Sequence, residues 1–394
     1  MKIKETKVSV KNAYERILFQ IEKDENLPTI VFFGGIHGNE KAGVKALEHL
    51  HDTLDISLFN GNVYGILGNL KALAKDQRYL EEDLNRLWTK AKIEHILSKT
   101  KHNTEELQLQ ELFQVLQKIL MKHKGPIYFI DLHTTSSQSL PFITINDALI
   151  NREFSKLFPV PIVLGIEEYL EGALLSYINT LGYVSIGFES GQHNDLRSVE
   201  NNIAFMYLAM VYAGILDEES VDVKTHLKTL KLASEDADRF YEIIHLQKIS
   251  ANDNFKMHNG FKSFQPITKG TPVAHFNNTE IHSDYNGNMF MPLYQNKGNE
   301  GFFIIKPIKP FFLKLSSLLR RIKTDSLLAY LPGVSWVNKQ EGILQVNLKV
   351  AKFFAKPLFH LLGYRNREIT STHLRLNNRE RVAKTKIYKR EPWY

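Results

Sequence analysis

The sequence predicts a protein of the α/β class: a sheet flanked by helices, then a small β-rich domain and a basic helical C-terminal extension. Up to about residue 216, short apolar runs alternate with amphipathic stretches, a pattern typical of a sheet covered by helices on both faces. Between 243 and 308, glycines separate short β-like runs, and after 311 lysines and arginines interrupt apolar stretches. We therefore expect three parts, comprising residues 1–220, 221–308 and 309–394.

The expected elements follow from the spacing of apolar residues. Continuous or alternating apolar runs predict strands at 7–23, 28–33, 62–67, 127–132, 159–164, 183–188 and 304–307. Apolar residues at helical spacing predict helices at 40–52, 104–123, 194–216 and 221–242. The run 127–132 is of the buried type expected inside a sheet that is covered on both faces.

The composition limits the chemistry that is available to the chain. Its apolar share of 43% and charged share of 24% over 394 residues are ordinary for a globular protein. The absence of cysteine excludes disulfides and thiolate metal ligands, so a transition-metal site must use histidines and carboxylates. The N-terminal segment lacks the apolar core of a signal peptide, and no stretch approaches the ~20 apolar residues of a spanning helix. We expect a cytoplasmic protein.

The net charge of +7 is unevenly distributed. Residues 306–394 hold 19 Lys/Arg and 5 Asp/Glu, a balance of +14, whereas the remaining 31 and 38 give −7. Two apolar stretches, 311–331 and 343–362, contain interspersed Lys and Arg, and within them 311–321 and 350–362 resemble basic amphipathic helices. Such helices can lie on an anionic membrane or pack on the protein itself or a sister subunit, so peripheral membrane binding and self-association as a homo-oligomer both stay open. No matching fold motif indicates a nucleic-acid partner.

Two segments predict a metal site at the ends of two strands. The glycine-rich segment 34–40 supplies His37 and Glu40 directly after one apolar run, and His133 follows a second run. Two imidazoles and a carboxylate are the protein ligands of a catalytic zinc site, in which the fourth position is left for water. Asp131 would face the same side as His133 and can orient its imidazole. We expect these residues to bind one Zn²⁺ per chain. The alternative is that each histidine is only a polar residue at the end of a strand and binds no metal.

The segment 76–86 predicts an anion clamp, because it contains Arg78, Asn85 and Arg86. A guanidinium matches a carboxylate in a bidentate way, and an asparagine adds a neutral donor. The alternative is a surface loop that pairs its own arginines and glutamates. A metal, an activated water and an anion clamp together indicate a hydrolase.

Glu189 is the candidate general base. It ends a short apolar strand between Gly187 and Gly191, so it can face the same crevice as the metal site. The alternative is an ordinary loop carboxylate. His193 is an accessory candidate, for which a plain loop position is the better interpretation.

These segments, in this order, resemble the succinylglutamate desuccinylase/aspartoacylase family. The resemblance rests on 34–40, 78–86, 131–135 and 187–189, and it extends over roughly residues 25–310. It implies a zinc carboxypeptidase-like mixed sheet and a C-terminal β domain that narrows the active-site channel. It thereby implies hydrolysis of the amide bond of a small N-acyl amino acid rather than of a peptide.

The resemblance also implies a role for each candidate. His37, Glu40 and His133 would bind zinc. Glu189 would deprotonate the water and pass the proton to the leaving amine, and Arg78 would polarise the scissile carbonyl. Substrate-binding roles fall to Asn85 and Arg86.

The chain departs from the family in one segment. Aspartoacylase has a further substrate arginine shortly before its catalytic glutamate, whereas residues 157–196 contain no Lys or Arg but include Glu167, Glu168 and Glu171. This difference argues against an acidic side chain on the substrate. Two rival functions stay open: a metallocarboxypeptidase acting on peptides, and a non-catalytic binding protein that uses the zinc fold as a scaffold.

Overall fold

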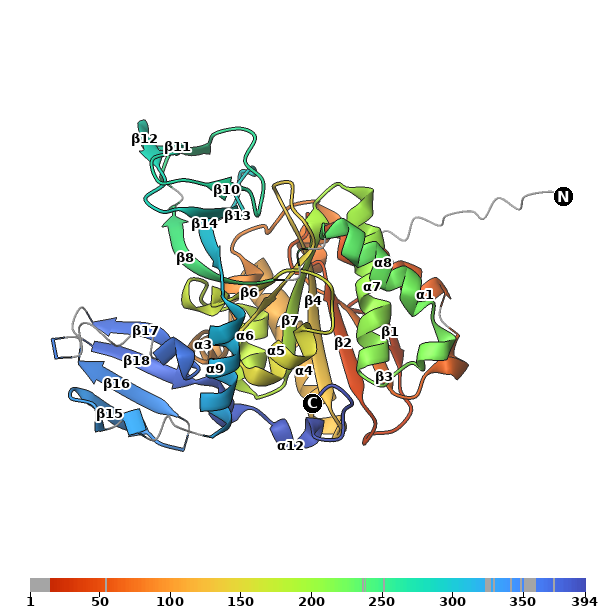
Figure 1. Cartoon of the computed structure of the whole chain (residues 1–394). Coiled ribbons are helices and arrows are strands. Elements are labelled where there is room, and N and C mark those ends of the chain that lie inside the picture. Colours follow the sequence, from red (N-terminus) through yellow and green to blue (C-terminus); the bar gives the residue numbers. More distant parts are fainter. Residues whose placement is uncertain are drawn as a thin grey trace.

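One sheet of eleven strands organises most of the molecule (Figure 1). The computed structural model describes residues 15–394 apart from 54, 236, 238, 251, 323–326, 329, 341, 348, 351–358 and 371–372. In spatial order the strands of this sheet are β1 (Ile17–Ile21), β3 (Asn62–Leu67), β2 (Thr29–Gly34), β4 (Ile127–Thr135), β7 (Val184–Gln192), β5 (Phe142–Ile145), β6 (Ile162–Leu164), β8 (Phe240–Lys248), β14 (Glu300–Pro307), β13 (Gly287–Phe290) and β10 (Pro266–Ile267).

The centre of this sheet is parallel, and its edges are antiparallel. Strands β3, β2, β4 and β7 run parallel, so their carboxyl ends meet at one edge. Strand β5 runs antiparallel to β7, and β8 pairs with β6 in parallel and with β14 antiparallel. The α/β class and the mixed sheet flanked by helices are therefore confirmed.

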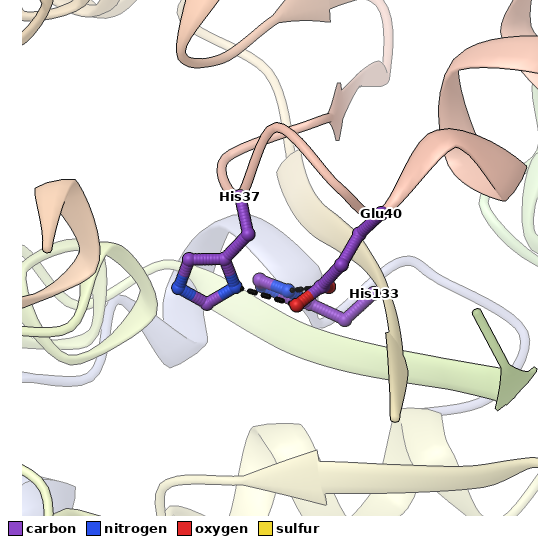
Figure 2. A group of neighbouring side chains, drawn as sticks. All are labelled: His37, Glu40 and His133. Atoms are coloured by element: carbon purple, nitrogen blue, oxygen red, sulfur yellow. Dashed lines mark hydrogen bonds and ion pairs between the residues drawn. The ribbon is translucent and has the colours of Figure 1, made fainter. Parts of the chain in front are cut away.

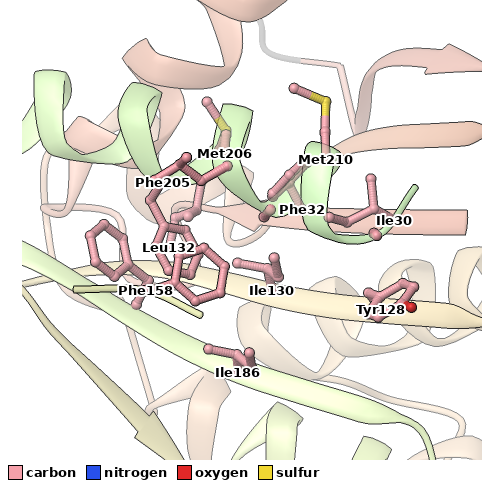
Figure 3. Close-up of a cluster of buried hydrophobic side chains, with 14 of the residues drawn as sticks. Ile30, Phe32, Tyr128, Ile130, Leu132, Phe158, Ile186, Phe205, Met206 and Met210 are labelled. Atoms are coloured by element: carbon pink, nitrogen blue, oxygen red, sulfur yellow. The ribbon is translucent and has the colours of Figure 1, made fainter. Parts of the chain in front are cut away.

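The core forms on both faces of the parallel strands. Along β2, Ile30 and Phe32 join a cluster with α1 (Lys41–Thr53) and α7 (Leu196–Tyr212), and Figure 3 shows Phe205 and Met206 of α7 packed over this face. The alternate residues of β2 face α4 (Thr104–Lys122). This alternation explains the continuous apolar runs, because both faces of a parallel strand are covered.

The remaining helices complete the covering of the sheet. They are α2 (Leu70–Ala74), α3 (Lys90–Ser98), α5 (Leu149–Ser155), α6 (Leu174–Thr180) and α8 (Val223–Ala233). The predicted helix 221–242 is too long, because α8 ends at Ala233. From Phe240 the chain forms β8, which pairs with β6 on one side and β14 on the other. Of the predicted strand 7–23, β1 accounts for Ile17–Ile21, and 7–14 lie outside the described residues.

The β-rich region continues the main sheet and adds a separate tip. Strands β8, β14, β13 and β10 extend the sheet, whereas β9 (Phe255–Met257), β11 (Pro272–Phe276) and β12 (Thr279–His282) form a three-stranded sheet. Figure 1 places this tip far from the C-terminal strands. The division into 1–220, 221–308 and 309–394 stays a prediction, since the main sheet runs through the first boundary.

The C-terminal extension begins with a helix but continues as a sheet. Helix α9 (Pro310–Arg321) confirms the first predicted amphipathic helix. The prediction of a helical extension is wrong for the segment that follows α9, because β15 (Val334–Asn338), β16 (Ile343–Asn347), β18 (His373–Asn378) and β17 (Tyr364–Thr370) form a sheet. Leu344 and Val346 of β16 are both fully buried. Their spacing of two residues is the period of a strand. Most of 350–362 lies outside the described residues.

Short helices α11 (Arg379–Val382) and α12 (Thr385–Tyr388) follow. A buried ion network fixes the extension to the body, because Arg320 Nη2 of α9 contacts Asp147 Oδ2 at 2.9 Å. No helix among the described residues is long and apolar enough to span a membrane. The cytoplasmic location stays a prediction.

Candidate active site

The loop between β2 and α1 positions His37 and Glu40. Gly35 in this loop has a φ of 71°, a conformation that glycine adopts without strain. Gly38 packs so closely that a Cβ there would lie 2.2 Å from the carbonyl carbon of Ala72. These two glycines allow the sharp turn that directs His37 and Glu40 into one crevice.

His133 reaches the same crevice from β4. Strands β2 and β4 are parallel neighbours, and Gly34 at the end of β2 pairs with Leu132, so His133 lies beside the loop that follows β2. Donor atoms of His37, Glu40 and His133 all lie within 4.8 Å of one another, and the three side chains are buried. Figure 2 shows both imidazoles directed at the carboxylate, with His37 Nδ1 2.7 Å from Oε1 and His133 Nδ1 2.8 Å from Oε2. We call these three residues the triad.

A second carboxylate stands behind each imidazole. His37 Nε2 lies 3.1 Å from Asp83 Oδ1, and His133 Nε2 lies 2.7 Å from Asp131 Oδ2. Carboxylates on the outer nitrogens fix the tautomer and orientation of metal-binding imidazoles. The sequence predicted this position for Asp131 but not for Asp83, because no spacing rule connects residue 83 with residue 37.

The triad is prepared electrostatically for a cation. Burial raises the pKa of the Glu40 carboxyl, but His37 and His133 outweigh burial and hold that pKa well below its usual range. Burial lowers the pKa of His133, but the neighbouring carboxylates Asp131 and Glu40 outweigh burial and raise this pKa well above its usual range. A buried, ionised carboxylate between two imidazoles is the donor set of a catalytic zinc site, so these residues can hold a metal ion.

Arg78 lies beside the triad. Its Nη1 is 3.4 Å from Glu40 Oε1, and its Nη2 is 3.2 Å from Asp83 Oδ2. Burial lowers the pKa of the guanidinium, but Asp83 and Glu40 more than compensate and raise it. Arg78 therefore remains a cation inside the crevice.

Glu189 is the register partner of His133 on the adjacent strand β7. Burial raises the pKa of its carboxyl to about 7. Its Oε2 is inaccessible to solvent and has no hydrogen-bond partner among the described residues. A buried carboxyl that titrates near neutrality is suited to accept and return a proton.

Asn85 and Arg86 line the same cavity, but each already uses part of its hydrogen-bonding capacity for a contact within the protein. Asn85 Oδ1 accepts a hydrogen bond from the Leu174 backbone N–H at 2.9 Å. Arg86 Nη2 pairs with Glu300 Oε1 of β14 at 2.9 Å. Sequence reasoning missed Glu300, which lies over 200 residues away in the β-rich region.

Comparison with known proteins identifies the family. Residues 26–212 match the model described as the succinylglutamate desuccinylase/aspartoacylase catalytic domain. This domain belongs to that family. The chain is 30% identical over 163 residues to a probable aspartoacylase of Acaryochloris marina, which covers 39% of this chain and 52% of that relative. It is 40% identical over 77 residues to a succinylglutamate desuccinylase of Photorhabdus laumondii subsp. laumondii, covering 19% and 23%.

An N-acyl-aromatic-L-amino acid amidohydrolase (carboxylate-forming) of Xenopus laevis is 29% identical over 109 residues, covering 27% of this chain and 34% of the relative. The chain thus matches about half of the first relative's length and less of the others.

Solved structures of the family share the fold. A succinylglutamate desuccinylase/aspartoacylase of Rhodobacter sphaeroides matches with a TM-score of 0.54 at 16% identity, over 73% of this chain and 88% of that chain. The product-bound ectoine utilization protein EutE of Ruegeria pomeroyi matches with a TM-score of 0.54 at 18% identity, over 73% and 87%.

One cavity of the protein collects every site residue that the sequence predicted. Besides His37, Glu40, Arg78, Asn85, Arg86, His133 and Glu189, its wall includes residues of the β-rich region, among them Leu293, Gln295, Glu300 and Phe303. The β-rich region therefore contributes a wall of the cavity, as expected for a region that narrows a channel. Glu167 also lines the cavity.

His193 is a cavity residue outside the triad. Its Nδ1 lies 2.7 Å from Thr134 Oγ1, and its Nε2 lies 3.3 Å from Gln295 Oε1. The Thr134 backbone N–H in turn donates to Glu40 Oε2 at 3.0 Å. Sequence reasoning missed Thr134 and Gln295, although the position of Thr134 directly after His133 at the strand end was the available signal.

Proposed function

We propose that this family member is a zinc-dependent amidohydrolase that cleaves the amide bond of a small N-acyl amino acid or a related conjugate. The observation that carries the proposal is the buried triad with Glu189 beside it in one cavity. A scaffold that only binds ligands has no physical need for a carboxyl whose pKa is raised to about 7 next to two imidazoles and an ionised carboxylate.

His37, Glu40 and His133 would hold the zinc ion. When bound, Zn²⁺ would polarise the substrate carbonyl and lower the pKa of a water molecule to about 7. Glu189 accepts the proton of the attacking water and returns it to the leaving amine. Arg78 stabilises the oxyanion that develops on the scissile carbonyl. Asn85 and Arg86 hold the substrate carboxylate, so that the scissile carbon stays in reach of the attacking water.

Three relatives support an acyl amino acid as the substrate class, since their names describe an aspartoacylase, a succinylglutamate desuccinylase and an N-acyl-aromatic-L-amino acid amidohydrolase. Within the cavity wall, the guanidinium groups are those of Arg78 and Arg86, and each already contacts carboxylates of the protein. We therefore propose a substrate with one carboxylate on its amino-acid part rather than two.

The β-rich wall separates this proposal from a metallocarboxypeptidase. Met291, Leu293, Gln295 and Phe303 line the cavity together with the metal ligands, which leaves less room for a long peptide. Peptides longer than three residues should therefore be poor substrates. Efficient cleavage of such peptides would favour the carboxypeptidase function.

The test is a screen of purified protein against N-acyl amino acids that vary in acyl length and side-chain charge. We expect release of free amino acid, its loss with a chelator and its recovery with Zn²⁺. Neutral side chains should be preferred over acidic ones. If no member of the panel is hydrolysed while zinc is bound stoichiometrically, the deacylase proposal fails and a binding function gains support.

A further inference from the structure

A second cluster of histidines and carboxylate lies at the β-rich tip. Donor atoms of His258, His275 and Glu280 all lie within 4.8 Å of one another. Among the described residues, this group and the triad are the two that bring three such ligands this close together. The tip cluster belongs to the three-stranded sheet of β9, β11 and β12, which is separate from the main sheet.

A tight turn fixes the register that creates this cluster. Asn277 and Asn278 join β11 to β12 with φ values of 49° and 66°, the pattern of a two-residue hairpin turn with both central residues at positive φ. Phe276 therefore pairs with Thr279, and His275 pairs with Glu280. Directly opposed residues project from the same face of a sheet, so the imidazole and the carboxylate are neighbours.

His258 approaches the pair from the strand beside β11. Its backbone N–H donates to Val273 O at 2.9 Å, which holds it at the end of β9. His258 Nε2 lies 3.3 Å from Glu280 Oε1, and the two rings of His258 and His275 are 4.9 Å apart. His258 Nε2 is inaccessible to solvent, yet none of its described contacts has the geometry of a hydrogen bond.

A third imidazole stands on the other side of the carboxylate. His282 follows Glu280 by two residues on β12, so both project from the same face. His282 Nε2 lies 3.5 Å from Glu280 Oε2. An ordinary surface ion pair would need only one imidazole beside the Glu280 carboxylate, whereas three histidines of the tip surround it.

We propose that the tip cluster is a second Zn²⁺ site, with His258, His275 and Glu280 as ligands. Imidazole nitrogens and a carboxylate oxygen suit this borderline metal, and His282 or a water can complete four-coordination. We expect a structural rather than a catalytic site, because Glu189 and Arg78 lie in the cavity of the triad and not at the tip. It goes beyond the proposed hydrolysis and does not depend on it.

The tip also has a direct connection to the catalytic cavity. Tyr294 Oη donates to His258 O at 2.7 Å and accepts from the Phe261 backbone N–H at 3.0 Å. Leu293 and Gln295, on either side of Tyr294, line the cavity. A metal that holds His258 in place therefore also stabilises the segment that forms this cavity wall.

The test counts zinc ions in full-length variants. His37→Ala/His133→Ala removes the triad, and calorimetric titration with Zn²⁺ should then show one ion per chain. Adding His275→Ala should abolish that binding, whereas adding His49→Ala, an exposed histidine of α1, should leave it unchanged. Absence of zinc from the first variant, or its persistence after His275→Ala, would overturn the site.

Two further measurements apply even where the triad variant fails to fold. With the triad intact, His275→Ala should lower the zinc content from two ions to one per chain, while Glu189-dependent hydrolysis continues. Hydrogen exchange of otherwise wild-type protein should show that the second equivalent of Zn²⁺ slows exchange at 256–261 and 292–295. Two ions retained in His275→Ala, or exchange unchanged in both segments, would contradict the proposal.

Discussion

The triad and the tip cluster present the same donor types in two very different settings. Each combines two imidazoles with one carboxylate within 4.8 Å. The triad is buried and has Asp83 and Asp131 behind its imidazoles, whereas Glu280 at the tip is 45% exposed. The two clusters thus share the same ligand types and differ in burial and in the groups around the ligands.

What distinguishes the triad is the set of groups around it. Glu189 supplies a carboxyl whose pKa is raised to about 7, and Arg78 supplies a buried cation. The electrostatic interactions of such groups are stronger in a buried, low-dielectric site, whereas water and salt screen them at an exposed site. The triad is therefore expected to do chemistry and the tip only to hold a metal.

The largest effect is expected from removing the general base. Glu189→Gln should lower kcat by about 10²–10⁴, the usual contribution of a positioned base, because the amide cannot accept the proton. Zinc content at both clusters should stay unchanged, as measured by elemental analysis. Glu242→Gln, an exposed carboxyl on β8, is the matched control and should retain full activity. Wild-type kcat in Glu189→Gln would eliminate it as the base.

Removing the buried cation comes next. Arg78→Met should lower kcat by about 10²–10³, since loss of one oxyanion donor has this typical effect. Steady-state kinetics should show a smaller change in KM, because the lost interaction strengthens in the transition state. A variant that changes KM alone would assign Arg78 to substrate binding instead.

A smaller effect is expected from the carboxylate behind His37. Asp83→Asn should weaken zinc binding at the triad by about 10–100-fold, because the His37 imidazole loses the partner that orients it. Competition with a chromophoric chelator measures this change. Zinc at the tip should bind as before, and equal weakening at both clusters would indicate a general loss of structure.

The smallest effect concerns the stability of metal-free protein. Burial raises the pKa of Glu189 from 4.5 to about 7, so the folded state binds this proton more tightly than the unfolded state. Stability should therefore fall as pH rises from about 4.5 to 7. Glu189→Gln should raise the Tm of metal-free protein at pH 8 and leave it nearly unchanged at pH 4, as measured by calorimetry. An equal rise at both pH values would exclude a titration effect.

The sequence predicted the triad because its ligands follow strands whose ends must coincide in a parallel sheet. His37 and Glu40 follow β2, and His133 lies near the carboxyl end of its neighbour β4. Asp83 and Glu300 could not be predicted in the same way, since their contacts depend on how a loop and a distant antiparallel strand fold back.

The C-terminal sheet was missed for a different physical reason. Over a short stretch, apolar residues interrupted by lysines fit both the helical and the strand period. In residues 343–347 the strand conformation is selected because β16 pairs with β15 on one side and with β18 on the other. The tip cluster was equally hidden, because its ligands come together only through the register that Asn277 and Asn278 impose.

We expect the buried cluster to catalyse hydrolysis and the exposed cluster to have no catalytic role. To test this difference, Zn²⁺ is titrated into metal-free His275→Ala and into metal-free His37→Ala/His133→Ala, and zinc occupancy is followed together with hydrolysis of the best N-acyl amino acid. We predict that activity of His275→Ala rises with the first equivalent and then stays constant, while the triad variant binds one zinc and remains inactive. Hydrolysis by the triad variant, or an inactive His275→Ala protein whose triad is loaded with zinc, would show that the triad is not the catalytic centre.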